Sequence, residues 1–407
     1  MESEARETLQ NFGENEPEVE TSQKTKNYSM KLIIGIISIV LIIVIITIIL
    51  IIFFEEEEED NLNCPDGCKD CIETELGIKC ISCFSGYIFI KDECIDYNSF
   101  NYSIKAIYKT DYINETIPLI HYMFVPHIKM MVIDDRAIIP NSENQFPTIG
   151  NHTIYYLFDN ELDYLGEMFY GADQLISITF TPIFDTSNIN NLNFMFYGCI
   201  NLAFINISSF NTENVENLSG MFELCKSLKS IDLKNFNTQN VTSMNMMFYG
   251  CSSLTSIDIS HFNTQYLTGM NNMFDGCNNL TSLNLSNFNT KYVTGMTRLF
   301  NRCYSLKSID LSNFNIEKVR FMEGMFEDCH SLTSLNISNF NTENVTKIDY
   351  MFYRCPKLEF LDISGFVYDK NVSLFYDLPE FGTLIVNKDF IDKINNQIPP
   401  EWEIKIK

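Results

Sequence analysis

The sequence predicts an α/β solenoid built from repeats of 26 residues, because three registers of apolar residues recur with that step. A fixed period between about 20 and 50 residues is typical of a solenoid or another repeat array. The registers are Cys199, Cys225, Cys251, Cys277, Cys303, Cys329 and Cys355; Leu202, Leu228, Leu254, Leu280, Leu306, Leu332 and Leu358; and Phe196, Phe222, Phe248, Phe274, Phe300, Phe326 and Phe352.

The pattern inside one repeat predicts the elements of each unit. Residues 254–259 alternate apolar and polar side chains at their end, as a strand with one buried face does. Residues 241–251 carry apolar side chains at i, i+3, i+6, i+7 and i+10, which favours one face of a short helix. We therefore expect strand, turn, short helix and return, which is a solenoid of the leucine-rich-repeat type over residues 166–365.

Two further registers are expected to be structural. A second register of phenylalanines, which runs from Phe210 to Phe340, is followed in each repeat by an asparagine, and a buried asparagine at a fixed step can bond the neighbouring backbone. The seven repeat cysteines are odd in number and end the apolar stripe. They therefore favour small buried residues with free thiols over a ladder of disulfides. The asparagines are Asn211, Asn237, Asn263, Asn289, Asn315 and Asn341.

Both ends of the repeats are expected to be capped, because an open solenoid end exposes its core. Predicted strands at 103–108, 128–133 and 152–158 indicate a small all-β, sandwich-like cap over residues 95–165. Residues 366–407 form the closing cap, with a strand, an amphipathic helix and a last strand in which Trp402 covers the open end.

The N-terminal part of the chain predicts a membrane anchor. Residues 32–54 are uncharged and apolar over 23 positions, long enough for one transmembrane helix. Residues 1–31 read as a disordered tail with lysines beside this segment, and 55–63 as an acidic linker. The positive-inside rule then places 1–31 in the cytosol, which is type II topology at the plasma membrane or another secretory-pathway membrane. A cleavable signal peptide is the alternative.

Residues 64–94 form a cysteine-rich stalk. In the oxidising compartment that this topology implies, an even set of closely spaced cysteines favours disulfides over a zinc ribbon. Six cysteines allow fifteen pairings, and the sequence does not select one. The set is Cys64, Cys68, Cys71, Cys80, Cys83 and Cys94.

These repeats resemble those of the BspA-like leucine-rich surface proteins of bacteria and protists. The shared phrase is Leu-x-Ser-Ile-Asp-Leu-Ser-x-Phe-Asn-Thr-x-x-Val-Thr-x-Met-x-x-Met-Phe-x-x-Cys, and it covers about residues 165–366. The stalk resembles the small modules of furin-like and growth-factor-receptor type. The first resemblance implies a surface protein of adhesion or antigen type, without naming its ligand.

Composition and spacing exclude several function classes. The net charge of −25 disfavours binding to phosphate backbones, so we exclude nucleic acid as a partner. We find no catalytic constellation, no phosphate-binding glycine loop and no cofactor motif, so we do not expect an enzyme. One strand position alternates between Asp and Asn, which we interpret as the solvated face of the sheet rather than a cation or sugar site. Its members are Asn206, Asp232, Asp258, Asn284, Asp310, Asn336 and Asp362.

Sequons for N-glycosylation are consistent with the predicted topology. Three of them lie at that outward strand position, where glycans would cover much of the sheet face. Eleven occur beyond the predicted membrane segment: Asn101, Asn114, Asn151, Asn206, Asn217, Asn240, Asn279, Asn284, Asn336, Asn344 and Asn371.

One cluster of basic residues interrupts the acidic ectodomain and is our candidate site for an anionic partner. The plainer interpretation is scattered surface charge balanced by nearby acids. The cluster comprises Lys291, Arg298, Arg302, Lys307, Lys318 and Arg320.

Taken together, these features predict a type II surface glycoprotein that binds or adheres to a protein or glycan on another surface. A structural coat or antigen spacer without a specific ligand is one alternative. A receptor ectodomain that signals through a co-receptor is the other.

Overall fold

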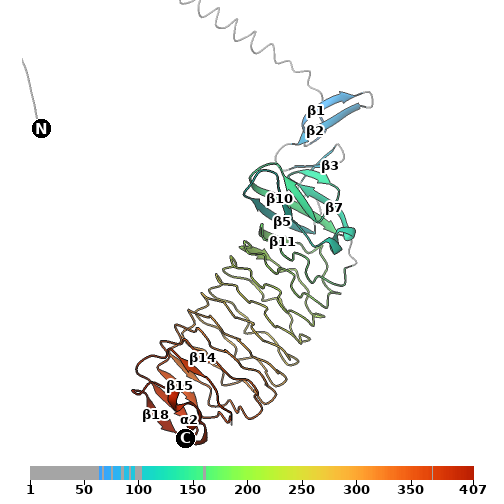
Figure 1. Ribbon diagram of the computed structural model, residues 1–407. Helices are drawn as coiled ribbons and strands as arrows, with labels where there is room; N and C mark the ends of the chain where they lie inside the picture. The colour runs from blue at the N-terminus through green and yellow to red at the C-terminus, as the bar shows by residue number, and fades with distance from the viewer. Residues whose placement is uncertain are drawn as a thin grey trace, which may run out of the picture. The chain divides into compact units, whose positions relative to one another are not determined.

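The computed structural model describes residues 64–66, 68–74, 77–83, 87–90, 93–96, 103–158, 162–368 and 370–407 (Figure 1). Contacts divide the chain into two units, 1–65 with 70–79, and 66–69 with 80–407. The predicted tail, membrane segment 32–54 and acidic linker lie outside the described residues. Among the described residues, no helix is both long enough and apolar enough to span a bilayer.

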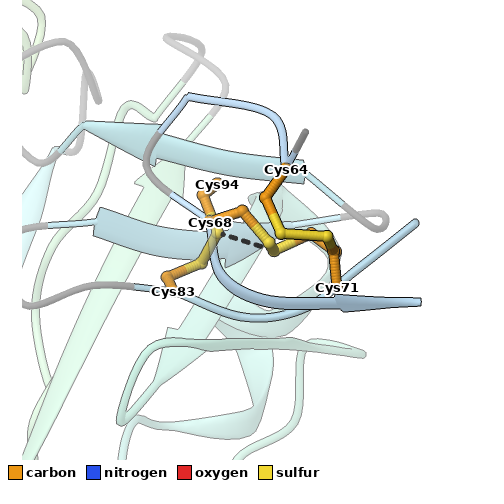
Figure 2. Close-up of a disulfide and its surroundings, with 6 residues drawn as sticks. Cys64, Cys68, Cys71, Cys83 and Cys94 are labelled. Atoms are coloured by element: carbon orange, nitrogen blue, oxygen red, sulfur yellow. Dashed lines mark hydrogen bonds between the residues drawn. A yellow bond between two sulfur atoms is a disulfide. The ribbon is translucent and has the colours of Figure 1, made fainter. Parts of the chain in front are cut away.

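The six stalk cysteines form three disulfides, as their even number predicted. Strands β1 (Cys68–Thr74) and β2 (Gly77–Cys83) pair as a two-stranded sheet. The bonds join Cys64 to Cys71, Cys68 to Cys80, and Cys83 to Cys94 (Figure 2). The Sγ atoms of Cys80 and Cys94 lie 3.2 Å apart. These thiols are consumed in disulfides, so they do not form the zinc ribbon that was the alternative.

The segment before the repeats is built from β-strands near the three predicted ranges, as we expected, but these strands belong to one sheet rather than to two layers of a sandwich. Its strands join one eight-stranded sheet, in the order β12-β11-β5-β10-β7-β8-β3-β4, so the cap continues directly into the first coils. The strands are β3 (Tyr87–Ile90), β4 (Glu93–Asp96), β5 (Ile104–Thr110), β7 (Ile128–Ile133), β8 (Arg136–Ile138), β10 (Gly150–Phe158), β11 (Leu175–Phe180) and β12 (Phe204–Asn206). A pair of strands, β6 (Glu115–Pro118) and β9 (Glu143–Phe146), and the 3-10 helix η1 (Tyr122–His127) complete this part.

The predicted α/β architecture is wrong, because the repeats form a β-solenoid without helices. The strand predicted for each repeat becomes β12, β13 (Ser334–Asn336) and β15 (Phe360–Ile363), which run parallel to their neighbours. Between β12 and β13, the described coils follow the same path as turns and extended segments (Figure 1). A second parallel ladder of isolated bridges runs through Asn191, Asn217, Ser243, Gly269, Gly295, Phe321 and Lys347.

The segment that we predicted to be helical shows why a periodic apolar stripe was not sufficient evidence for a helix. Its stripe is fully buried, as expected, but Met246 and Gly250 both adopt positive φ, +57° and +70°. A right-handed helix cannot contain such residues. Backbone N–H groups of Met244, Met246 and Phe248 instead donate to carbonyls of the next coil at 2.9–3.0 Å. The spacing therefore reflects successive turns that point every third side chain inward.

The core is a set of ladders that run along the solenoid. Nine phenylalanines, from Phe169 to Phe375, stack with ring centroids 5.5–5.9 Å apart and planes within 19° of parallel. The seven repeat cysteines are buried free thiols, and each donates to a phenylalanine carbonyl at 3.1–3.3 Å. Burial raises the pKa of all seven thiols, which keeps them protonated.

The closing cap contains the elements that the sequence predicted. Its elements are β16 (Phe375–Tyr376), β17 (Thr383–Val386), α2 (Lys388–Ile394), η2 (Asn395–Gln397) and β18 (Glu403–Ile406). Strand β16 pairs with β14 (Phe352–Tyr353) of the last coil. Strands β13, β15, β17 and β18 form a parallel sheet in that order. Trp402 is buried and its Nε1 donates to the Pro379 carbonyl at 2.8 Å, so it covers the end of the core.

Candidate partner-binding surface

The structure divides the predicted basic cluster among three positions of the repeat. Lys307 lies directly before the segment 308–310, which is equivalent to β13 one repeat earlier. Arg298 and Arg302 lie in the turns before Cys303, both at positive φ. Lys291, Lys318 and Arg320 lie beside the second ladder of bridges. Only this last group forms a patch in which cations and exposed aromatic rings meet.

Tyr292 is the centre of that patch. The Nζ atoms of Lys318 and Lys291 lie 4.4 Å and 5.5 Å from the centroid of its ring. Tyr266 occupies the same register one coil earlier, and Phe321 lies in the next coil, where it bridges Gly295; they are 53% and 44% exposed, respectively, against 38% for Tyr292. Tyrosine and arginine are enriched among the anchor residues of binding surfaces. The tyrosine–lysine patch is Tyr266, Lys291, Tyr292, Lys318, Arg320 and Phe321.

Backbone hydrogen bonds between coils fix the patch. Thr294 N–H donates to Thr268 at 3.0 Å, and Arg320 N–H donates to Thr294 at 2.8 Å. Arg320 also extends Nη1 to the Asn344 carbonyl at 2.8 Å. These bonds hold the backbone of adjacent coils in place, so binding at the patch would need little ordering of the backbone.

The patch is also the positive part of this ladder. Segments 291–295 and 317–321 each carry a net charge of +1, although the second includes Glu317. The equivalent segment 213–217 carries −2, and those at 187–191, 239–243, 265–269 and 343–347 are neutral. An anionic group is therefore attracted to this part of an otherwise acidic chain.

Arg302, in contrast, is part of an internal ion pair. Its Nε and Nη2 donate to Asp275 Oδ1 at 2.9 Å and 2.6 Å, and its guanidinium lies over the Tyr249 ring. The Asp275 side chain is only 1% exposed. Burial raises the pKa of Asp275 and Arg302 opposes that rise. Arg302 therefore compensates a buried charge and is removed from our candidate site.

The Asp/Asn register at the outward strand position has a structural role. Each Oδ1 accepts a hydrogen bond from the N–H two residues later at 2.9–3.1 Å, which closes an Asx turn. Hydrogen bonds from the Lys234 and Ser260 side chains, and then these backbone bonds, lower the carboxyl pKa of Asp232 and Asp258. In Asp310 the backbone bond is the first cause of the lowered pKa. Most members are exposed, as expected for a solvated face, and Asp362 is instead buried against Lys407.

The asparagine register contradicts our expectation that its side chains are buried. Those side chains are exposed and cap their own turns, whereas the following threonine is buried. Each threonine Oγ1 donates to a carbonyl in the next coil and accepts an N–H from the same residue, as Thr238 does with Asn263 at 3.0 Å and 2.8 Å. Ile316 takes the threonine position in one coil and has no hydroxyl to make these bonds.

Ten of the eleven sequon asparagines lie among the described residues, and none of them is buried. Asn101 lies outside the described residues. Asn240 and Asn344 donate their side-chain amides to carbonyls of the preceding coil, at 2.9 Å and 3.1 Å. Of the three at the outward strand position, Asn206 is half-buried, and Asn284 and Asn336 are exposed. Glycosylation of these residues stays a prediction.

A buried carboxyl group lies at the edge of the turns and was not predicted. Glu223 is 8% exposed, and its Oε2 has no hydrogen-bond partner. Tyr197 and Tyr249 occupy the same register in the two neighbouring coils. Burial raises the pKa of Glu223 to about 7. The sequence does contain a signal for this site, because Glu223, Asp275 and Glu327 recur at one turn position that holds tyrosine or, at residue 301, asparagine in the other repeats.

Glu223→Gln is expected to stabilise the chain at pH 8 by roughly 1–2 kcal/mol. The folded-state pKa lies above that of the unfolded chain. The contribution of this carboxyl to stability is therefore fully present below about pH 4.5 and is lost as the pH rises through about 7. Urea-unfolding midpoints of both proteins at pH 5 and pH 8 test this. An equal change of midpoint with pH in the two proteins would contradict it.

Comparison with known proteins gives one family. Residues 163–282 and 252–366 match the family described as "Mycoplasma protein of unknown function, DUF285". The two ranges overlap and together span 163–366, half of the chain and the repeats themselves. Neither range includes the stalk, so its resemblance to furin-like modules stays a prediction. No curated protein and no solved structure matches the chain.

Proposed function

Because the chain belongs to the DUF285 family, we propose that its repeats form the binding ectodomain of a cell-surface protein. A repeat-containing family of this kind and a rigid solenoid fit a binding or adhesion role. The repeats present a regular surface along which side chains at equivalent positions can vary without changing the fold. The BspA-like resemblance of the repeats supports the same proposal.

We further propose a type II arrangement, in which residues 32–54 are the single membrane span and 55–407 lie outside. The support is the uncharged apolar run, the lysines before it and the acidic residues after it. Three disulfides suit an oxidising compartment. Exposed sequon asparagines suit a glycoprotein.

The tyrosine–lysine patch is the proposed contact site, and its partner carries anionic groups on a glycan or a protein. The observation that carries this proposal is the pair of lysine ammonium groups held against the exposed Tyr292 ring. Ammonium groups form charge-assisted bonds with carboxylate or sulfate. Tyrosine adds a rigid apolar surface at a low cost in conformational entropy.

Reversing both lysines, Lys291→Glu with Lys318→Glu, is expected to weaken adhesion to anionic surfaces at least about tenfold. Full-length protein with a C-terminal tag would be displayed on host cells and tested against beads coated with dextran sulfate or with an acidic polypeptide. The difference between the two beads identifies the class of partner. Binding is expected to fall as salt rises, because the contacts are exposed.

Lys226→Glu with Lys229→Glu is the matched control, since it makes the same change of charge on exposed lysines outside the patch. Antibody staining of the tag on intact cells measures display and tests the proposed topology. An equal loss of bead binding in both double variants would mean that the net charge of the chain, and not the patch, determines adhesion. No saturable binding by the wild type would favour a coat or spacer.

A further inference from the structure

The last strand of the solenoid has a free edge. Strand β18 ends the parallel sheet and, among the described residues, pairs only with β17. All four of its residues are exposed. At the other end of the repeats, antiparallel β5 covers the equivalent edge of β11. An uncovered edge strand presents a row of backbone donors and acceptors to another chain.

The hydrogen bonds to β17 show which groups are free. Glu403 N–H donates to Gly382 at 2.8 Å, and Lys407 N–H donates to Val386 at 3.0 Å. Backbone groups alternate in direction along a strand, so those of Ile404 and Ile406 point to the open edge. In an antiparallel pair, residues whose groups point outward lie directly opposite each other and exchange two hydrogen bonds.

The charges select one register for pairing of β18 with itself. With Ile404 opposite Ile404, Glu403 lies opposite Lys405, and Glu401 lies opposite Lys407. A register centred on Ile406 would place Lys405 opposite Lys407. A register centred on Trp402 would place Glu401 opposite Glu403. Opposite charges stabilise a cross-strand pair and like charges destabilise it.

Exposed apolar side chains accompany this pattern. Ile404 and Ile406 are 42% and 50% exposed, and pairing would cover part of both. Glu403 and Lys405 are salt-bridged within the strand at 3.0 Å but are more than half exposed, so both can exchange partners. Lys407 differs, because it pairs with the buried Asp362 and is expected to keep that partner, so the Glu403–Lys405 pairs select the register.

We propose that β18 pairs antiparallel with β18 of a second copy of this chain, which gives a two-fold symmetric, tail-to-tail dimer. The same surface is used by both copies, as a closed two-fold interface requires. Pairing would continue the sheet β13-β15-β17-β18 into the second solenoid. This interface is independent of the tyrosine–lysine patch and of any other partner.

Cysteine cross-linking of the full chain in mild detergent tests the register. Ile404→Cys is expected to give a disulfide-linked dimer under gentle oxidation, because residues opposite each other lie about 5.5 Å apart at Cα. A mixture of Glu403→Cys chains and Lys405→Cys chains is expected to cross-link, while each alone does so weakly. Tyr376→Cys, exposed outside β18, is the control. Equal cross-linking of the Tyr376 and Ile404 variants would overturn the proposal.

A charge exchange tests the pairing by sedimentation of the same full chain. Glu403→Lys alone, or Lys405→Glu alone, is expected to raise the dimer dissociation constant about tenfold, because like charges then face each other. The double variant restores opposite charges and is expected to dimerise like the wild type. A wild type that stays monomeric at about 100 µM, or a dimer insensitive to either single change, would overturn the proposal.

Discussion

Phe248→Ala is expected to destabilise the solenoid by about 3–5 kcal/mol, the cost of a large cavity in a well-packed core. The Phe248 ring is fully buried between Phe222 and Phe274, at centroid distances of 5.7 Å and 5.8 Å. Each neighbouring pair also contributes beyond the buried area through its stacked geometry. The shift of the urea-unfolding midpoint measures the loss.

Phe321→Ala is the matched control, since it removes the same ring from an exposed position and is expected to cost less than about 0.5 kcal/mol. Hydrogen exchange adds a spatial test. Contacts in a solenoid are made between neighbouring coils, so the lost protection should be greatest in the coils that flank residue 248. Similar midpoints for the two variants would contradict a continuous phenylalanine core.

The phenylalanine and cysteine ladders could be predicted from the sequence because a fixed period requires equivalent residues to stack. The helix could not be predicted correctly, because inward side chains at every third position look alike in a helix and in successive turns. The difference lies in the backbone. Gly220 and Gly250, each at positive φ, mark two turn positions per repeat that a helix excludes. Met246 and Leu224 also adopt positive φ at those positions in other repeats, and because they are not glycines the sequence does not mark those turns.

The candidate site was predicted in part. The basic residues could be identified in the sequence. Which of them lie close together depends on the path of the backbone in each coil, and the helix that we predicted gave the wrong path. Lys318 and Lys291 meet only because residues 26 or 27 apart lie in adjacent coils around Tyr292. Arg302 belongs to the same basic cluster in the sequence, but the structure places it at a turn beside the buried Asp275. Pairing of the stalk cysteines similarly needed the structure, because the spacing alone allows fifteen arrangements.

Arg302→Met is expected to destabilise the chain by about 2–4 kcal/mol at neutral pH, because it leaves the Asp275 carboxylate buried without its partner. The pKa of Asp275 is already raised by burial, and it rises further without the opposing guanidinium. A folded-state pKa above that of the unfolded chain means that stability falls as the pH rises through this range. The loss is therefore expected to be smaller at pH 4.5 than at pH 8.

Two comparisons make this prediction specific. Arg298→Met changes the same residue type at another positive-φ position, φ +50°, where the exposed arginine forms no salt bridge with the described residues and its charge acts on Asp275 more weakly than that of Arg302 does. It is expected to cost less than about 0.5 kcal/mol. Adding Asp275→Asn to Arg302→Met removes the unpaired charge and should recover much of the lost stability, which a double-mutant cycle quantifies.

Because Arg302 acts within the fold, its loss should leave adhesion through the tyrosine–lysine patch unchanged while the chain stays folded. If the Arg302→Met variant were as stable as the wild type but adhered more weakly, Arg302 would have to be counted among the residues that contact the partner.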